Sequence, residues 1–386
     1  MKSDETTPAA PRRPRWRRWL TWVLRLGTGA VALGLVAFII AYWMSDNTCG
    51  DPDTPAPRNP MKAVLYCDYG SPDVLRFEDV EKPIPLDDQV LVRVRAVSVN
   101  PLDWHYMRGE PYIMRLGTGL RRPKETQLGV DFAGTVEAVG KSVTRFKPGD
   151  EVFGGRHGAF TQYVAVHEDR AVVLKPANLT FEQAASIPIA AITALQGLRD
   201  KGKLQPGQKV LINGASGGVG TYAVQIAKWL GAHVTGVCST RNVDMVRSLG
   251  ADEVIDYTKD DFTRGERRYD LILDNVGNRG LLECRRVLAL RGSYVLIGGG
   301  KSGEQGVFGP LWGPVKMFLL SPFVSQEMGL FMADLKQEDL ATLGDLMQSG
   351  KLTPVIDRRY SFRELPEAVR YLEEGHARGK VVISVD

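Results

Sequence analysis

The chain has 386 residues, of which 44% are hydrophobic and 24% charged, with a net charge of +4. This length is too great for one compact core and predicts two domains with an extension. The weak net charge argues against a nucleic-acid-binding protein. The four cysteines, Cys49, Cys67, Cys238 and Cys284, are far apart and include no Cys-x-x-Cys pair. We therefore expect neither a metal site nor a disulfide framework.

The first sixty residues differ in composition from the rest of the chain. Residues 26–44 carry no charge, and as a helix they are long enough to cross the core of a bilayer. Trp19 and Trp22 lie near one end and Tyr42 and Trp43 near the other, where aromatic belts are expected. The pattern predicts, within residues 1–60, a basic N-terminus, one transmembrane helix at about 20–44 and a proline-rich linker. The expected localisation is a single-pass membrane protein attached to the lipid bilayer.

Other interpretations of this region stay open. A cleaved signal peptide is disfavoured by the length of the apolar run and by the lack of a clean small-x-small cleavage site. The chain could also start at Met61, where a self-sufficient domain begins. Arginines before the apolar stretch and acidic residues after it place the bulk of the chain outside the cytoplasm. A loose twin-arginine motif at Arg17–Thr21 would provide the route, but the side of the membrane remains undecided.

A strand, a turn of small residues and a helix follow one another near the middle of the chain. Lys209–Asn213 is a short apolar run typical of a buried parallel strand, and helical spacing of apolar residues begins at Val219. Ala215, Gly217 and Gly220 occupy the three small positions of the pattern G-x-G-x-x-G. Small residues there let the backbone approach a pyrophosphate at the N-terminus of the helix. The residues predicted to bind it are Gly214, Ala215, Ser216, Gly217, Gly218, Val219 and Gly220.

The end of the next strand, at 233–239, indicates which dinucleotide binds. An acidic residue at this place would hold the ribose 2′-hydroxyl of NAD. The chain instead has Ser239, Thr240 and Arg241, whose hydroxyl and guanidinium groups suit a 2′-phosphate. The predicted cofactor is therefore NADPH. Tyr257, which ends the following strand, either covers the adenosine end of the cofactor or packs within its sheet.

The remaining pattern predicts two kinds of sheet. Apolar runs at 252–257, 269–277 and 292–300 alternate with helical stretches, as in a doubly wound parallel sheet. Upstream, residues 89–100 alternate apolar and polar side chains, as in a half-buried antiparallel strand. We therefore expect an α/β fold in which a β-rich domain precedes the parallel sheet.

Several motifs give the chain a resemblance to a known family. They include "SVNPLDWHYMRG" at 98–109, "LGVDFAGTVEAVG" at 128–140, the glycine turn at 211–220 and "HARGKVVISV" at 376–385. In this order they resemble the medium-chain dehydrogenase/reductase superfamily, in its zinc-free, quinone oxidoreductase-like branch. The resemblance implies a GroES-like catalytic domain at 61–185, a Rossmann NADP(H)-binding domain at 186–320, and a C-terminal part at 321–386 that completes the catalytic domain. It also implies a homodimer.

The same resemblance implies roles for individual residues. The zinc alcohol dehydrogenases of the superfamily have a cysteine in the segment that matches "SVNPLDW" and a His-Glu pair in the segment that matches "GVDFAG". This chain has no cysteine there and has Val130-Asp131 in place of the pair. By position, the residues implied on the nicotinamide side of the cofactor are Thr193, Asn275, Val276, Gly277, Ile297, Gly298, Gly299 and Lys380.

Without a metal, the chemistry that fits best is hydride transfer to a conjugated electrophile. An enone or quinone accepts the hydride and leaves an enolate oxygen, which hydrogen-bond donors can stabilise. The candidate donors are Tyr106, the first choice, then Asn100 and His105. We expect an NADPH-dependent reductase of quinones or α,β-unsaturated carbonyl compounds. A metal-free alcohol or aldehyde oxidoreductase, or an NADPH-binding sensor without turnover, is the alternative.

Overall fold

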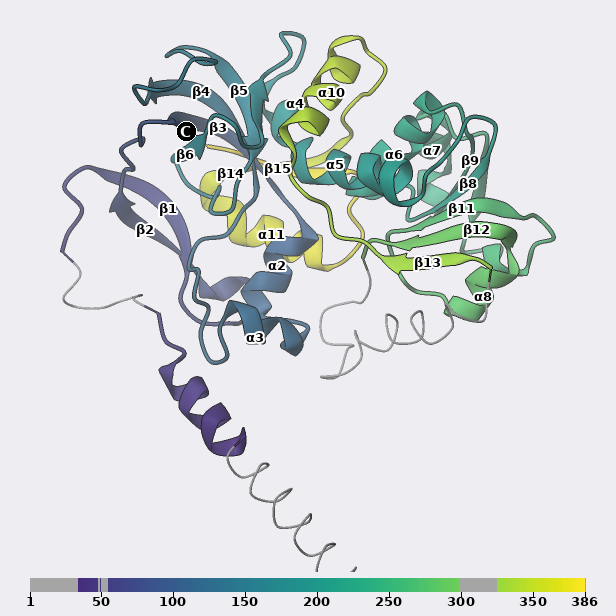
Figure 1. Cartoon of the computed structure of the whole chain (residues 1–386), viewed down its shortest axis with the longest axis horizontal. Helices are drawn as coiled ribbons and strands as arrows, with labels where there is room; N and C mark the ends of the chain where they lie inside the picture. Colours follow the sequence, from purple (N-terminus) through teal and green to yellow (C-terminus); the bar gives the residue numbers. More distant parts are fainter. Residues whose placement is uncertain (1–33, 48, 50–54, 299–324, 386) are drawn as a thin grey trace, which may run out of the picture.

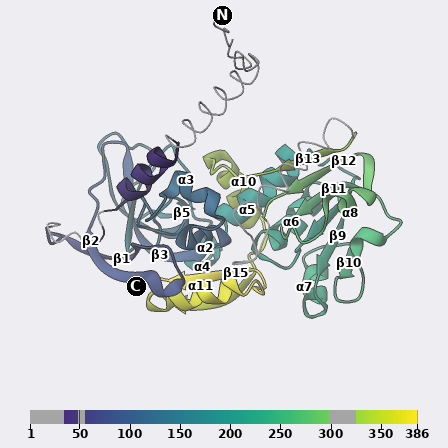
Figure 2. The same cartoon turned by 90° about the horizontal axis from the view of Figure 1, so that it is seen from below.

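The computed structural model describes residues 34–47, 49, 55–298 and 325–385. The chain folds around two large sheets that lie side by side (Figure 1). Helix α5 (Pro188–Gln196) lies between them, as the view from below shows (Figure 2). Its side chains are buried almost all round in one apolar cluster with residues of both sheets, among them Phe153 and Val210. The two halves therefore share a core.

The first half is built on a mixed sheet of seven strands, in the order β14-β15-β3-β4-β5-β7, with β6 also paired to β3. Central β3 is antiparallel to β4, β6 and β15, as the alternation at 89–100 predicts. Val92 and Val94 are buried in it, whereas Arg93 and Arg95 are exposed. The strands are β3 (Gln89–Val99), β4 (Asp131–Val139), β5 (Glu151–Gly155), β6 (Tyr163–His167), β7 (Val172–Leu174), β14 (Ile356–Ser361) and β15 (Lys380–Ser384), beside a hairpin of β1 (Pro60–Tyr66) and β2 (Leu75–Glu81).

The second half is a six-stranded sheet in the order β10-β9-β8-β11-β12-β13, and each neighbouring pair is parallel. This is the predicted parallel sheet. Its last strand was not predicted and lies beyond residue 320, where the sequence analysis ended the nucleotide domain. The strands are β8 (Lys209–Asn213), β9 (His233–Cys238), β10 (Glu253–Asp256), β11 (Tyr269–Asp274), β12 (Leu288–Leu296) and β13 (Glu327–Leu330).

The helices of the two halves cover the sheets, and one segment ties the halves together. Strand β15 returns to the mixed sheet, where Val381 pairs with Val99. Just before it, the Gly379 N–H donates to the Ser216 carbonyl at 2.9 Å, so the same segment also touches the glycine turn. The helices are α2 (Pro101–Arg108), α3 (Arg115–Thr118), α4 (Phe181–Ala185), α6 (Gly218–Trp229), α7 (Val243–Ser248), α8 (Leu281–Arg286), α10 (Gln337–Gln348) and α11 (Leu365–Glu373).

The prediction for the N-terminal region requires a correction. From residue 34 to residue 44 the chain is an exposed helix that projects from the body (Figure 1). Among the helices of the described residues, none combines the length and the apolar character that a membrane crossing requires. The predicted localisation as a single-pass membrane protein is wrong on this finding. The rest of the predicted span, up to residue 33, lies outside the described residues.

The segment after this helix is fastened to the mixed half. Cys49 and Cys67 form a disulfide with their Cα atoms 5.5 Å apart. The Asn47 amide also donates to the carbonyls of Cys67 and Pro123, at 2.8 and 3.0 Å. The sequence analysis expected no disulfide framework. The structure has a single bridge, which no spacing motif indicates because the two cysteines meet only through the fold.

Candidate cofactor and active site

The glycine turn between β8 and α6 has the predicted order of strand, turn and helix. Gly214 has a φ of 76°, in the left-handed region that favours glycine. A Cβ on Gly220 would lie 2.0 Å from the Gly214 carbonyl oxygen, so this position is closed to any side chain. Ala215 is buried, and its N–H donates to Val237 of β9 at 3.0 Å. The turn thus brings bare backbone to the start of α6, whose first N–H groups suit a pyrophosphate.

The amide of Asn242 links this turn to the end of β9. Its Nδ2 donates to Ser216 Oγ at 3.0 Å and to Ser239 Oγ at 3.3 Å. Its Oδ1 is buried and has no hydrogen-bond partner among the described residues. Because buried polar atoms rarely lack a hydrogen-bond partner, this oxygen is available to a ligand that passes here. The residues present therefore fit a dinucleotide that passes from the turn to the end of β9.

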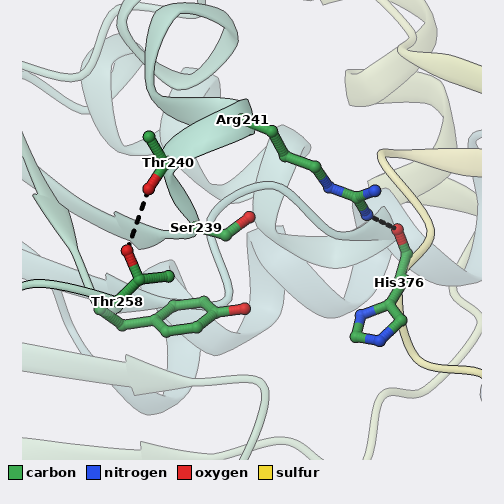
Figure 3. Close-up of a pocket in the computed structure, with 6 residues that line it drawn as sticks. Ser239, Thr240, Arg241, Thr258 and His376 are labelled. Atoms are coloured by element: carbon green, nitrogen blue, oxygen red, sulfur yellow. Dashed lines mark hydrogen bonds between the residues drawn. The ribbon is translucent and has the colours of Figure 1, made fainter.

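A pocket of about 350 Å³ lies at that end of β9, and we call it the phosphate pocket. Figure 3 shows Thr240 and Thr258 on one side of it and Arg241 with His376 on the other. Ser239, Thr240 and Arg241, which were predicted to bind the 2′-phosphate, therefore lie together with Tyr257. Sequence reasoning missed Thr258 and His376, which come from other segments. The pocket is lined by Ser239, Thr240, Arg241, Tyr257, Thr258 and His376.

The two threonines of the phosphate pocket are engaged with an acid beneath them. Thr240 Oγ1 donates to Asp256 Oδ2 at 2.6 Å, and Thr258 Oγ1 donates to Asp256 Oδ1 at 2.8 Å. These hydrogen bonds, that of Thr240 first, lower the pKa of Asp256 to about 2 and keep it ionised. A hydroxyl has one proton to donate, so Thr240 has none left for a phosphate. Thr240 therefore contributes to the phosphate pocket indirectly, through its hydrogen bond to Asp256.

The carboxyl ends of β8, β11 and β12 meet at a buried aspartate that the sequence analysis did not single out. Asp274 Oδ1 accepts from the N–H groups of Val276 and Gly277, at 3.0 and 2.8 Å. Its other oxygen accepts from the Tyr294 hydroxyl at 2.7 Å. Asp274 therefore fixes the loop that follows β11, which is the loop the family resemblance places at the nicotinamide.

Asn275, Ile297 and Gly298, which are also expected on the nicotinamide side, lie around this loop. Asn275 Nδ2 donates to the Asn213 carbonyl at 2.9 Å, whereas its Oδ1 is buried without a partner in the described part of the chain. The Ile297 N–H donates to the Asp274 carbonyl, and Gly298 lies beside the Asn275 carbonyl. Thr193, on α5, donates to the Ile189 carbonyl at 2.6 Å. Gly299 lies outside the described residues.

Lys380 belongs to a set of side chains that we call the buried polar cluster. Its ammonium group lies 3.3 Å from Asp131 Oδ2 and also donates to Asn100 Oδ1. Lys380 is only 3% exposed. Asp131 further accepts from Asn100 Nδ2 at 2.9 Å and from Ser98 Oγ at 2.7 Å. The members of the cluster are Ser98, Asn100, Asp103, Asp131 and Lys380.

Burial governs the charges within this cluster. Burial raises the pKa of Asp103 to about 7, against the hydrogen bonds that its carboxylate accepts from the Asn100 and Gly129 N–H groups. Burial likewise lowers the pKa of Lys380, and the neighbouring Asp131 opposes that shift. Asn100 uses both ends of its amide inside the cluster. It therefore positions other groups and has no donor left for a substrate.

The two remaining candidate donors differ in what they can offer. His105 Nδ1 lies 2.7 Å from the Glu110 carbonyl, which can only accept, so Nδ1 carries the proton. Burial lowers the pKa of His105, and the neutral ring then presents Nε2 as an acceptor. Tyr106 is half-buried with its ring 5.6 Å from that of His157. Its hydroxyl has no partner among the described residues and can donate.

One half of the protein is a parallel sheet with a glycine turn and a phosphate pocket. The other half is a mixed sheet that β15, the last strand of the chain, completes. Together they define a two-domain dinucleotide-binding protein. Residues 86–177 match the family described as "Alcohol dehydrogenase GroES-like domain", and residues 249–383 match "Zinc-binding dehydrogenase". Within the described residues, no group of three or more His, Cys, Asp or Glu side chains could hold a metal ion.

Known proteins of the same type align with most of the chain. A 2-methylene-furan-3-one reductase of Solanum lycopersicum is 36% identical over 340 residues, which cover 84% of this chain and 79% of the relative. An NADPH-dependent alkenal/one oxidoreductase of Arabidopsis thaliana is 33% identical, covering 86% and 81%. The quinone oxidoreductase structure from Coxiella burnetii superposes with a TM-score of 0.74 at 29% identity, covering 85% and 100%.

The chain therefore belongs to the medium-chain dehydrogenase/reductase superfamily, in its quinone oxidoreductase-like branch. It is an NAD(P)-dependent oxidoreductase with a GroES-like and a Rossmann-like domain. The resemblance seen in the sequence is confirmed.

Proposed function

We propose that this enzyme uses NADPH to reduce conjugated electrophiles, namely quinones or α,β-unsaturated carbonyl compounds. The observation that carries the proposal is the state of the three candidate donors. Asn100 and His105 are engaged, whereas the Tyr106 hydroxyl is free to donate within the described part of the chain. One neutral donor suits a substrate whose oxygen gains negative charge during reduction. The names of the relatives, an enone reductase and an alkenal/one oxidoreductase among them, support this substrate class.

NADPH, when bound, supplies the hydride. The chain holds it along one line of residues: 214–220 at the pyrophosphate, Ser239 and Arg241 at the 2′-phosphate, and the nicotinamide side at 275–277 with Ile297 and Gly298. The unpartnered oxygens of Asn242 and Asn275 lie along this line and support it. Tyr257 forms a wall of the phosphate pocket, at the adenosine end. Thr193, Asn100 and Lys380 position the surroundings, because each side chain is already hydrogen-bonded within the protein.

The same proposal divides the chain by task. Residues 61–185 and 321–386 hold the substrate, and residues 186–320 hold the cofactor. Because β13 pairs with β12, we extend the cofactor-binding part past residue 320 to include Glu327–Leu330. Tyr106, on α2, then stands on the substrate side and donates to the oxygen of the conjugated substrate. A proton from solvent completes the product.

The test follows NADPH oxidation with a panel of quinones, enals, enones, saturated aldehydes and, with NADP+, simple alcohols. We expect turnover of the conjugated compounds and at most about one hundredth of that kcat/KM for their saturated counterparts, a margin of about 2.7 kcal/mol. Comparable rates with saturated aldehydes or alcohols would contradict the proposed substrate class. Tight NADPH binding without oxidation on any compound would indicate a sensor instead.

A further inference from the structure

One residue of the phosphate pocket, His376, comes from the mixed half of the protein. Its role extends the NADPH site proposed above. His376 lies between α11 and β15, a segment that belongs to the mixed half. Its side chain is exposed and lines the phosphate pocket opposite Thr240 and Thr258 (Figure 3). Within the described residues the imidazole ring forms no hydrogen bond. Because this polar ring faces the pocket and has no hydrogen-bond partner within the described residues, it is available to a ligand.

The other groups of the phosphate pocket leave few donors for a phosphate. The hydroxyls of Thr240 and Thr258 are engaged with Asp256. Ser239 Oγ accepts from Asn242 and keeps its own proton. Arg241 uses one N–H of its Nη2 on the His376 carbonyl, at 2.6 Å, and keeps the rest of its fork. A dianionic group in this pocket therefore meets Ser239, Arg241, the Tyr257 hydroxyl and the ring of His376 as its polar neighbours.

The backbone of His376 also has a task that is separate from the ring. Its carbonyl anchors Arg241, and three residues later Gly379 bonds to Ser216 in the glycine turn. The segment 376–379 therefore touches both phosphate-binding places of the parallel half. A substitution of the His376 side chain leaves both backbone contacts in place, so the ring can be tested alone.

We propose that His376 is a specificity-determining residue, whose imidazole binds the 2′-phosphate of NADPH from the catalytic half while Arg241 binds it from the nucleotide half. The proposal rests on the NADPH site proposed above. A phosphate with donors on two sides is held by both halves of the enzyme. Discrimination between NADPH and NADH then depends on how the halves are seated, and not only on residues at the end of β9.

The experiment is calorimetric titration of the full chain with 2′,5′-ADP and with 5′-AMP, which differ only in the 2′-phosphate. We expect His376→Ala to weaken 2′,5′-ADP about ten-fold, as for loss of one charge-assisted hydrogen bond, and to change 5′-AMP affinity less than two-fold. His376→Gln, which keeps an N–H donor, recovers part of the loss. His233→Ala is the matched control, because His233 is exposed at the opposite end of β9. Thermal melting verifies that each variant is folded.

Two results would overturn the proposal: unchanged 2′,5′-ADP affinity in His376→Ala, or an equal loss for both nucleotides, which would assign the ring to the adenosine. Because no turnover is measured, these outcomes are distinct from failure of the proposed substrate class. If the unmodified chain bound 2′,5′-ADP no better than 5′-AMP, the NADPH assignment and this role of His376 would both be wrong.

Discussion

The phosphate pocket and the buried polar cluster both contain polar and cationic side chains, but they differ in how many of these still have free donors. In the pocket, Arg241 retains most of its N–H groups and His376 has a ring without a partner in the described structure. In the cluster, Asn100, Asp131 and Lys380 satisfy one another and are shielded from water. A polar residue near a site can therefore bind the ligand or hold the backbone around it. The hydrogen bonds that the residue already makes, rather than its residue type, show which of these two roles it has.

The largest effect is expected from breaking the buried polar cluster. Asp131→Asn removes the carboxylate charge 3.3 Å from the buried Lys380 ammonium, and this should lower the free energy of unfolding by about 3–5 kcal/mol. Denaturant unfolding followed by tryptophan fluorescence measures it. The double variant with Lys380→Met should recover a large part of the loss, since no unpaired charge remains. A single-variant loss below about 1 kcal/mol, the value of a surface pair, would show that the cluster is not a structural unit.

The glycine turn tests whether the cofactor side depends on backbone shape as well as on charge. Gly220→Ala places a Cβ 2.0 Å from the Gly214 oxygen, so the turn must open. We expect NADPH affinity, measured by fluorescence titration, to fall about 100-fold, as for a displacement of about 1 Å in a preorganised site. Gly117→Ala is the control, because nothing lies within 4 Å of its added Cβ. An affinity within a few-fold of the unmodified enzyme would contradict the assignment of the turn.

A variant of Tyr106 tests whether a free donor acts on the substrate side. Tyr106→Phe removes the free hydroxyl and keeps the ring, so kcat should fall about 100-fold, as for loss of one donor to a developing oxyanion. NADPH affinity should not change. Steady-state kinetics with an enone, together with NADPH titration, separates the two effects. An unchanged kcat would show that another donor acts, and would leave Tyr106 as a lining residue.

The last effect concerns the pH dependence of stability. Burial raises the pKa of Asp103 to about 7, above the value of about 3.9 for an unfolded chain. The folded state therefore holds this proton longer than the unfolded state, so the contribution of Asp103 to stability falls as pH rises from about 4 to about 7. In Asp103→Asn this part of the slope should disappear. Unfolding free energies at about pH 5 and pH 7.5 measure it, and parallel slopes for the two proteins would contradict the shift.

The sequence predicted the elements whose cause is local. The apolar run at Lys209–Asn213, the small residues after it and the alternation in β3 each follow from periodicity and turn chemistry, and the structure has them. It did not predict His376 in the phosphate pocket, Lys380 in the buried polar cluster or the Cys49–Cys67 bridge. Each of these depends on a contact between distant segments, which no local pattern encodes. Strand β13 was not predicted because it has only four residues.

The contact between Arg241 and His376 also has a consequence for how the protein is made. The two residues are 135 positions apart, and Gly379 then closes on Ser216. The glycine turn and Arg241 leave the ribosome well before the residues that finish their surroundings. A nascent chain, or one clipped by a protease ahead of residue 376, thus carries a nucleotide fold whose binding site is incomplete. Retention on immobilised 2′,5′-ADP would separate full-length molecules from such fragments.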